Sequence, residues 1–350
     1  MSIPSECDRR AGSVSVSSCI STEACSRSLA VVTLLLFSSL PDSARAQVSP
    51  GEARTIQNGI GARVEALTIL GGDFGFSDGT FHSTGALEPG QRADVDLNIA
   101  KFGGAGEIGD PIPLGDLGIG WQPRIQGSMG YLTSSNHLEA PETGDTNEYK
   151  TSSIEFGGGA RFWTSERFSF APTLMALYGH TVDSYAVQSA FARQNLPELE
   201  QLGLINWHID TWSLRPALNI QYVIPLDRTL ITLSSDSTDF YTRGFATSNA
   251  NVRVQGNSGF LTNKIDVDVP LGLELFGHEL RSGGYLSRTD LFGDLKTGLA
   301  VQHLNEVHGR IVLDFLNQFW KFQWLGLGAS YVWGPNMTGW TVGADATFRF

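Results

Sequence analysis

The last eleven residues of the chain alternate strictly between apolar and polar side chains. On an extended strand, one face would carry the apolar residues Trp340, Val342, Ala344, Ala346, Phe348 and Phe350. The opposite face would carry Thr341, Gly343, Asp345, Thr347 and Arg349. A strand that is apolar toward lipid, polar toward an interior and closed by an aromatic residue is typical of the last strand of a bacterial outer-membrane barrel. We expect Phe348 and Phe350 to form the signal that the barrel assembly machinery reads.

The start of the chain predicts export. A short basic flank at Arg27 precedes an apolar run at 29–40, and Ala44-Arg45-Ala46 is a small-x-small cleavage site before Gln47. This run is shorter than the roughly 20 apolar residues that a membrane-spanning helix needs. We therefore predict a signal peptide at 1–46, an N-terminal segment at 47–61 that can enter the lumen, and a barrel at 62–350. An uncleaved membrane anchor is the alternative, but no basic stop-transfer flank follows the run.

Composition agrees with this division of the chain. Cys7, Cys19 and Cys25 all precede the cleavage site, so the mature chain is expected to have no disulfide and no thiolate metal site. The mean hydropathy is only −0.07, because a barrel alternates its lipid-facing residues with polar lumen residues. A net charge of −12 gives no basic face for nucleic acid, and we expect no such partner.

Runs with a period of two residues predict an all-β fold, a closed antiparallel transmembrane barrel of twelve strands. The predicted strands cover 62–71, 92–102, 118–132, 154–163, 168–179, 212–224, 228–240, 265–276, 295–303, 307–315, 320–333 and 340–350. Aromatic residues gather near the strand ends, as girdles at the two membrane interfaces require.

The connections alternate between short and long, which is typical of outer-membrane barrels. We expect periplasmic turns at 164–167, 225–228 and 316–319, and long extracellular loops at 133–150, 181–211 and 241–264. Residues 186–202 have helical composition, although Pro197 interrupts them. Two connections fit less well, because 277–294 is long for a periplasmic turn and 305–306 is short for an extracellular loop.

Ten charged residues fall on the polar face of their predicted strands, and we expect them to line the lumen. They are Asp94, Asp96, Arg124, Arg161, Arg215, Asp266, Asp268, Arg310, Asp345 and Arg349. An unpaired charge in a narrow, partly dry lumen is costly, so a structural network of ion pairs is the favoured interpretation over a catalytic one.

Two groups of residues resemble metal ligands. His303, Glu306 and His308 could supply two imidazoles and a carboxylate to zinc, but they do not have the helical spacing of a zinc protease. His137 and Glu139 lie in an acidic loop where divalent cations could be held. Polar residues at a loop tip are the favoured explanation of the first group, and a solvated loop explains the second group equally well. No nucleotide-binding or nucleophile motif occurs in a fitting context, and we predict no metal, cofactor or catalytic residue.

With its leader, its twelve strands, its lack of a large exported domain and its ending Ala344-Asp345-Ala346-Thr347-Phe348-Arg349-Phe350, the chain resembles the solitary outer-membrane autotransporter-like barrel family. The resemblance implies a barrel in the outer membrane, in contact with lipid and lipopolysaccharide, and brings no catalytic residues. The leading hypothesis is a non-enzymatic narrow channel, or a structural, translocator-like barrel without a passenger. The alternatives are an enzyme acting on lipid or peptide at the outer leaflet, and a surface receptor or adhesin.

Overall fold

The computed structural model describes residues 61–68, 70, 75–86, 92–115, 118–138, 145–188, 190–319 and 322–348. The predicted signal peptide, residues 47–60, Arg349 and Phe350 lie outside these ranges.

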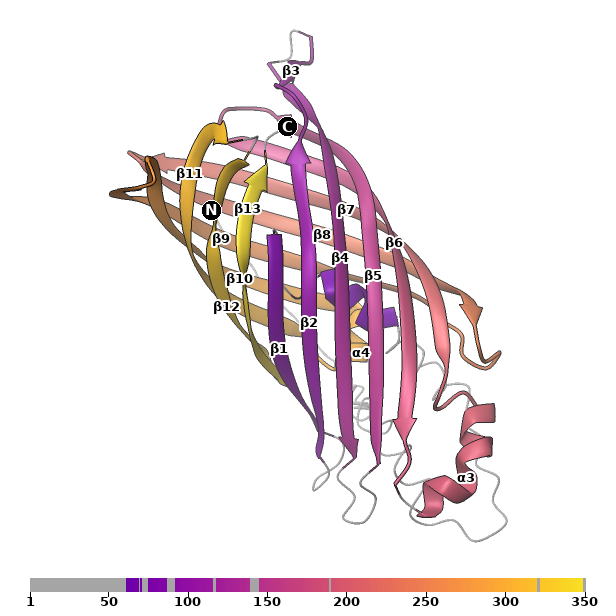
Figure 1. Ribbon diagram of the computed structural model, residues 1–350. Helices are drawn as coiled ribbons and strands as arrows, with labels where there is room; N and C mark the ends of the chain where they lie inside the picture. Colours follow the sequence, from indigo (N-terminus) through magenta and orange to yellow (C-terminus); the bar gives the residue numbers. More distant parts are fainter. Residues whose placement is uncertain are drawn as a thin grey trace, which may run out of the picture. The chain divides into compact units, whose positions relative to one another are not determined.

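Long antiparallel strands dominate the described part of the chain (Figure 1). They are β1 Gly75–Ala86, β2 Arg92–Glu107, β4 Gly120–Leu138, β5 Thr146–Trp163, β6 Phe168–Ala186, β7 His208–Leu226, β8 Thr229–Thr247, β9 Gln255–Leu275, β10 His278–Gly293, β11 His303–Phe319, β12 Phe322–Trp333 and β13 Met337–Phe348. Each pairs with its neighbours in the chain, β1 pairs with β13, and β2 pairs with β4. These pairings close a twelve-stranded barrel, as the sequence predicted. The two-residue strand β3, Ile112–Pro113, lies in the connection between β2 and β4.

Two of the twelve strands were predicted at wrong positions. Residues 61–68 form a helix, and the first strand begins only at Gly75. The predicted strand at 295–303 mostly forms the short helix α4, Asp294–Leu299, and the segment expected to be a long turn contains β10. Asn305 and Glu306, expected in a loop, lie inside β11. The predicted number of strands is nevertheless twelve, because next to each wrongly predicted strand lies a real strand, β1 or β10, that the sequence did not predict.

The two ends of the barrel differ in their connections. At the end that we call the turn end, β5–β6, β7–β8 and β9–β10 are joined by a few residues. At the opposite end, which we call the loop end, β6 and β7 are joined through helix α3, Ala190–Gln201, which has Pro197 inside it as predicted. The strands extend further toward the loop end than the periodicity indicated; β8, for example, continues to Thr247.

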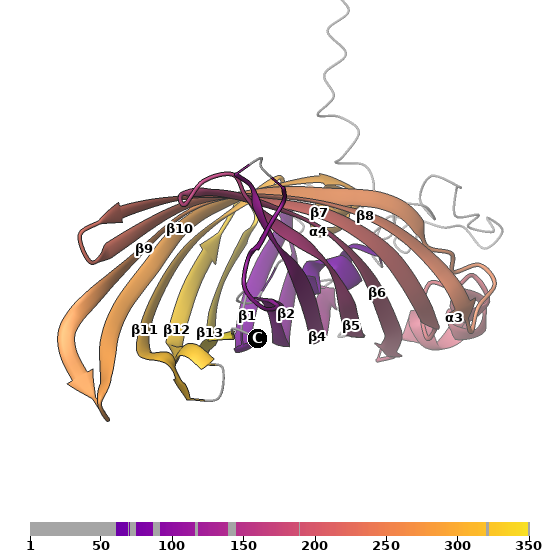
Figure 2. The same ribbon diagram turned by 90° about the horizontal axis from the view of Figure 1, so that it is seen from above.

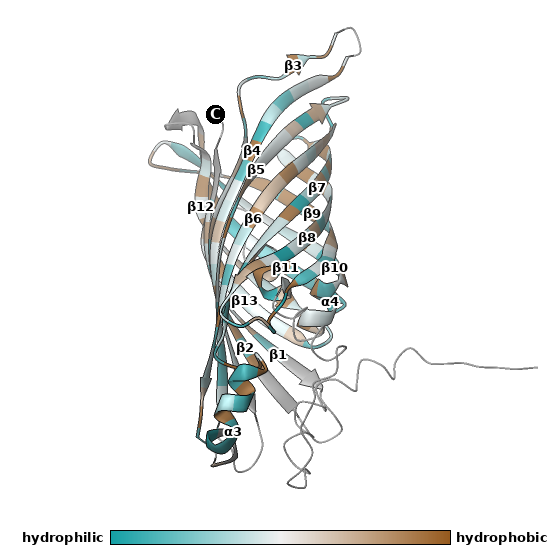
Figure 3. Ribbon diagram, turned by 90° about the vertical axis from the view of Figure 1, so that its right-hand side faces the viewer, coloured by the Kyte–Doolittle hydropathy of each residue, from teal (hydrophilic) through white to brown (hydrophobic). Residues whose placement is uncertain are grey.

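Side chains alternate between the two faces of the wall. Hydrophilic and hydrophobic residues follow one another along the strands in Figure 3. On β9, Ile265 is 52% exposed on the outer face, whereas Asp266 lines an interior cavity. Apolar side chains on the outside of a barrel face the hydrocarbon of the membrane. Among the described residues, no helix has the length and apolar character needed to cross a bilayer.

The apolar core lies inside the barrel, around the helix at 61–68. Ala62, Val64 and Leu67 are buried against a collar of apolar side chains from the wall. The collar includes Phe81, Leu97, Ile99, Leu132, Leu177, Phe240, Phe260, Leu291, Leu304, Val332 and Met337. The helix lies on the concave side of the strands (Figure 2). These contacts fill the lumen at the level of the helix.

Candidate functional site in the barrel lumen

The interior helix touches strands on opposite sides of the barrel. Two strands meet it at glycines: an added Cβ would lie 3.1 Å from Leu67 Cδ2 at Gly130 on β4, and 2.5 Å from Val64 Cγ1 at Gly179 on β6. On β2, Lys101 Nζ donates a hydrogen bond to the Thr68 carbonyl at 3.1 Å. These three strands lie near one another in the wall, and the contacts of Glu65 with β8 and β9 reach across the lumen, so we call the helix at 61–68 the plug.

Glu65 anchors this plug to the far wall. Its carboxylate accepts a hydrogen bond from Thr242 Oγ1 on β8 at 2.6 Å and another from Ser258 Oγ on β9. The helix does not itself cross the bilayer, and Glu65 is almost completely buried within the lumen. Burial raises the pKa of Glu65 to about 7, against the lowering effect of the two hydroxyl donors, and the nearby Asp294 carboxylate raises it further. Because the partners of Glu65 are hydroxyl groups, its carboxyl group can hold the helix against the wall while it is protonated and neutral.

The helix points its N-terminal end toward the loop end. Arg63 lies over the Tyr149 ring, 3.8 Å from the ring centre. Tyr149 packs with Trp207, Ile209, Val252 and Val254 in a second apolar cluster formed by the strand ends and loops. Arg63 therefore connects the plug to the structures that cover it.

A cavity of about 660 Å³ lies on the turn-end side of the helix. It extends from Thr68, at the C-terminal end of the helix, to Glu166 and Arg167 in the turn after β5. Polar and charged side chains from most of the wall line it. The lumen is thus divided into an apolar part that holds the helix and a polar part that reaches the turn end.

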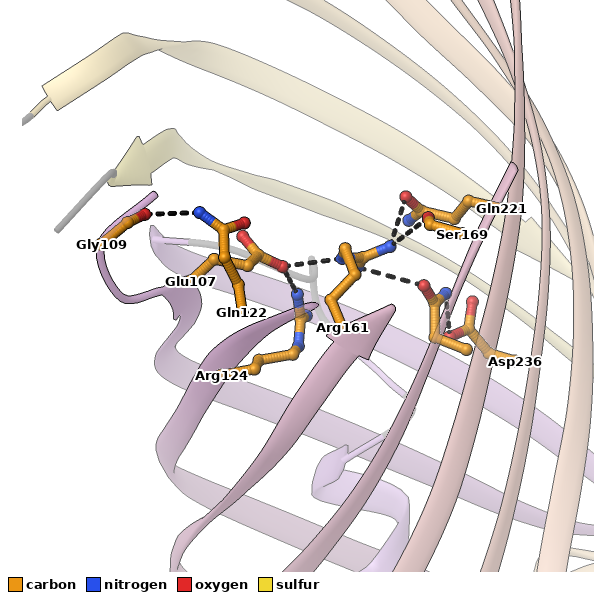
Figure 4. A network of polar contacts seen from close by, with 9 residues as sticks. Glu107, Gly109, Gln122, Arg124, Arg161, Ser169, Gln221 and Asp236 are labelled. Atoms are coloured by element: carbon orange, nitrogen blue, oxygen red, sulfur yellow. Dashed lines mark hydrogen bonds and ion pairs between the residues drawn. The ribbon is translucent and has the colours of Figure 1, made fainter. Parts of the chain in front are cut away.

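Arg161 organises one wall of the cavity (Figure 4). Its Nε donates to Glu107 Oε1 at 2.8 Å, and Arg124 also pairs with Glu107. The remaining guanidinium donors reach Ser169 at 3.0 Å, Gln221 at 2.9 Å and Asn219 at 3.2 Å. Strands β2, β4, β5, β6 and β7 are therefore joined through a single side chain of β5 and its partners.

The opposite wall carries a second network. Arg310 on β11 donates two hydrogen bonds to Asp266 on β9, at 2.7 and 2.8 Å, and its guanidinium lies 4.8 Å from the centre of the Trp324 ring. His308 lies between Ser330, 2.8 Å from Nδ1, and Asp345, 3.1 Å from Nε2. These pairs join β9, β11, β12 and β13 in the same way that Arg161 joins the other wall.

The structure brings together six of the ten residues that we expected in the lumen. The cavity is lined by Arg124, Arg161, Arg215, Asp266, Arg310 and Asp345. Arg215 pairs with Glu155, and Asp268 accepts a hydrogen bond from Arg281 Nε at 2.5 Å. The side chain of Asp94 and the whole of Arg349 lie outside the described residues.

The prediction for Asp96 is wrong. Leu97 and Ile99, its neighbours on β2, point inward into the core around the helix, so Asp96 points outward and pairs with His82 at 2.9 Å. The face of β2 is inverted relative to the prediction because the helix makes this level of the lumen apolar. An apolar residue therefore belongs inside here, although elsewhere in the barrel it belongs outside.

The candidate metal ligands do not converge. Glu306 and His308 face inward on β11, where Glu306 accepts a hydrogen bond from Tyr285 and His308 stacks on the same ring. His303 is an odd-numbered residue of the same strand and faces outward. In the part of the chain that the structure describes, no three His, Cys, Asp or Glu side chains are placed to hold a metal ion. The side chains of His137 and Glu139 fall outside that part.

A Ser-His-Asp set does occur, but it lies within the barrel wall and not at the outer leaflet, where the enzyme hypothesis placed its activity. His308 and Asp345 reach the cavity, whereas Ser330 is buried at the junction of β11 and β12 and does not line it. A nucleophile needs access to substrate as well as a base. The three side chains serve to tie neighbouring strands together.

Sequence reasoning missed the carboxylates that complete the networks. Glu155 has the inward parity of its strand, and this signal could have identified it as the partner of Arg215. Glu107 has the inward parity that β2 shows in the structure, but the sequence pattern assigned that parity to the lipid face, so Glu107 was not identifiable as a partner of Arg161. Glu65 gave no such signal, because its segment was interpreted as a strand. Its role depends on a helix that only the structure reveals.

Comparisons with known proteins agree with the barrel. The model of a family described as the solitary outer membrane autotransporter beta-barrel domain matches residues 112–343. The transport unit of the autotransporter AIDA-I from Escherichia coli has 10% identity and a TM-score of 0.52, covering 83% of this chain and 99% of that one. The beta domain of the Bordetella autotransporter BrkA has 14% identity and a TM-score of 0.46, covering 78% and 99%. The translocator domain of NalP from Neisseria meningitidis has 12% identity and a TM-score of 0.43, covering 87% and 100%. No curated protein sequence matches.

Proposed function

The chain belongs to the family of solitary outer membrane autotransporter beta-barrel domains, and its location is the bacterial outer membrane; on this basis we propose that it is a narrow channel which its own helix at 61–68 keeps closed. The polar cavity forms the open half of the channel, and the plug forms the closed half. The side chains of Arg124, Arg161, Arg215, Asp266, Arg310 and Asp345 are then the pore lining.

The position of the helix is the observation that carries this proposal. Its contacts with Gly130, Gly179, Thr242 and Ser258 come from β4, β6, β8 and β9, so the helix crosses the space through which a solute would pass. A lumen of twelve strands is wider than that of a filled eight-stranded barrel and narrower than that of a porin. An eight-residue helix of about 10 to 12 Å diameter is a suitable obstruction for a lumen of that class.

Planar-bilayer recording tests the proposal directly. The intact protein should show little conductance above bare lipid, whereas a variant in which residues 61–68 are replaced by eight glycine and serine residues should show stable, larger steps. Equal conductance in both proteins would contradict the plug. No conductance in a correctly folded variant would contradict the channel.

Two further assignments follow from the same premise. The turn end faces the periplasm and the loop end faces the exterior, so the cavity opens toward the periplasm. The outer wall contacts lipid and lipopolysaccharide, and the barrel assembly machinery recognises the final strand through Phe348 and Phe350. The order of short and long connections supports the orientation, and the alternation at 340–350 supports the recognition.

A further inference from the structure

A patch of polar side chains interrupts the apolar outer surface of the barrel on β8 to β11. The inward residues Ser234, Asp236 and Thr238 line the cavity, so the residues between and after them on β8 face outward. The same alternation on β9, β10 and β11 gives a patch composed of Ser235, Ser237, Asp239, Asn263, Arg288, Asp290 and Asn305. We call these seven residues the polar patch.

The patch is continuous across four strands. Ser235 is paired in register with Asn263, Asn263 with Arg288, and Arg288 with Asn305. Two residues further toward the loop end, Ser237 on β8 and Asp290 on β10 are both paired in register with Leu261 of β9. The polar side chains therefore form one continuous row across four strands, with Ser237 and Asp290 beside it on the two sides of Leu261.

Exposed apolar side chains border the patch on both sides. Toward the turn end the border consists of Leu233, Ile265, Leu286 and Val307, and toward the loop end it contains Tyr241 and Phe292. Tyr241 contacts Trp212 edge to face at 5.9 Å, and aromatic residues of this kind mark the level of a membrane interface. The patch thus lies within the lipid-facing zone and not above it.

Most side chains of the patch have no partner among the residues that the structure describes. The side chains of Ser235, Ser237, Asp239, Asn263 and Asn305 make no hydrogen bond or ion pair there, whereas Arg288 pairs with Asp290 at 2.9 Å. The outward polar residues of β1 and β2 behave differently: Thr80 donates to Asn98 at 3.1 Å, and His82 pairs with Asp96 at 2.9 Å. Hydrocarbon offers no hydrogen bond, and charged groups on the lipid face of a barrel are destabilising.

We propose that the polar patch is the contact surface for a second copy of this chain in the membrane. Asp239 on β8 and Arg288 on β10 stand on the two sides of β9. A two-fold axis parallel to the barrel axis exchanges these sides, so that Arg288 of one copy faces Asp239 of the other. Asn263 lies between them, and its amide both donates and accepts, so it can pair with its own equivalent.

The charge of the patch favours this partner over lipopolysaccharide. Phosphate groups could pair with Arg288 but would leave Asp239 and Asp290 facing a like charge, whereas a second copy offers its own Arg288 to Asp239. A second copy supplies Arg288 to Asp239 and Asp239 to Arg288, and its Asn263 can pair with the amide of Asn263. The proposal does not depend on whether the lumen conducts.

Photo-crosslinking in intact outer membranes tests the contact. A benzophenone side chain in place of Asn263 should give an adduct that contains two copies of this chain. The same group in place of Phe102 on β2 is the matched control, because β2 lies opposite β9 in the strand order and Phe102 is exposed on the outer face. Equal adducts at the two positions, or an adduct at 263 that contains lipopolysaccharide or another protein, would overturn the proposal.

Charge exchange separates the contact from an effect on folding. Arg288→Glu and Asp239→Arg should each reduce the adduct at 263 by at least about tenfold, because each substitution removes both symmetry-related charge pairs of the interface. The double variant Asp239→Arg/Arg288→Glu should restore it, because each copy then offers the exchanged charges. Unchanged crosslinking in either single variant, or no recovery in a double variant that inserts normally, would contradict the two-fold contact.

Discussion

Arg161 on β5 donates from Nε to Glu107 on β2 at 2.8 Å, across the intervening strand β4. We predict that Arg161→Met lowers the stability of the barrel by about 3 kcal/mol, because it leaves the partly buried Glu107 carboxylate with one partner fewer and three polar acceptors without a donor. The midpoint of unfolding in denaturant, measured in lipid vesicles, reports this change. Arg228→Met is the control, since Arg228 is 62% exposed and its pair with Glu279 should contribute less than about 1 kcal/mol.

Gly179 leaves the space that Val64 of the plug occupies. We predict that Gly179→Val displaces the helix and raises the conductance of the channel, because a Cβ at this position meets Val64 at 2.5 Å and Thr211 Oγ1 at 2.8 Å. Gly309→Ala should leave conductance unchanged, because nothing lies within 4 Å of a Cβ there. A Gly179→Val barrel that folds and conducts like the parent protein would contradict the contact between β6 and the plug.

Glu65 makes docking of the plug dependent on pH. Its pKa is raised from 4.5 to about 7, so the folded protein binds the proton more tightly than the unfolded chain does between these values. Stability gained in this way is fully present below the lower pKa and is lost as the pH rises through about 7. Channel opening should therefore be more frequent at about pH 8 than at about pH 5.5, with Asp294 adding repulsion in the same direction. In Glu65→Gln the difference should disappear, and persistence of the difference would place the titrating group elsewhere.

Phe350 provides a test of assembly. Replacing Phe350 with Ser should leave unfolded protein in the periplasm, because the aromatic end of the final strand is the proposed recognition element. Heat-dependent mobility on gels separates folded barrel from unfolded chain in membrane fractions. A normal amount of folded Phe350→Ser protein in the outer membrane would show that recognition lies elsewhere. Thr341→Ser, on the inward face of the same strand, is the control.

Periodicity predicted the barrel because most of its strands separate lipid from a wet interior. Ile265, Val267 and Val269 point outward and Asp266 points inward for that reason. The same rule fails around the plug. Ala62, Val64 and Ala66 alternate like strand residues, but they belong to a helix that is enclosed by apolar side chains. Phe81, Leu97 and Ile99 then face inward to meet it, which is why Asp96 was assigned to the wrong face.

The strand prediction around β10 was wrong for another reason. Residues 278–285 contain Arg281, Ser282, Gly283 and Gly284, which lack the apolar alternation of a lipid-facing strand, yet they pair with β9 and β11 on both edges. A register shift between Leu280 and Arg281 further disturbs the pattern.

The charged residues of the lumen were easier to predict from the sequence. Inward parity identified Arg161 and Arg310, but only the structure gives the distances that select Glu107 and Asp266 as their partners.

The helix at 61–68 is joined to β1 by a few residues and is wrapped by strands from every side. Once β1 has paired with β13, the wall is closed on all sides, so the helix can enter or leave the lumen only along the axis of the barrel. Biogenesis must therefore either close the barrel around the helix or thread the helix in from one end.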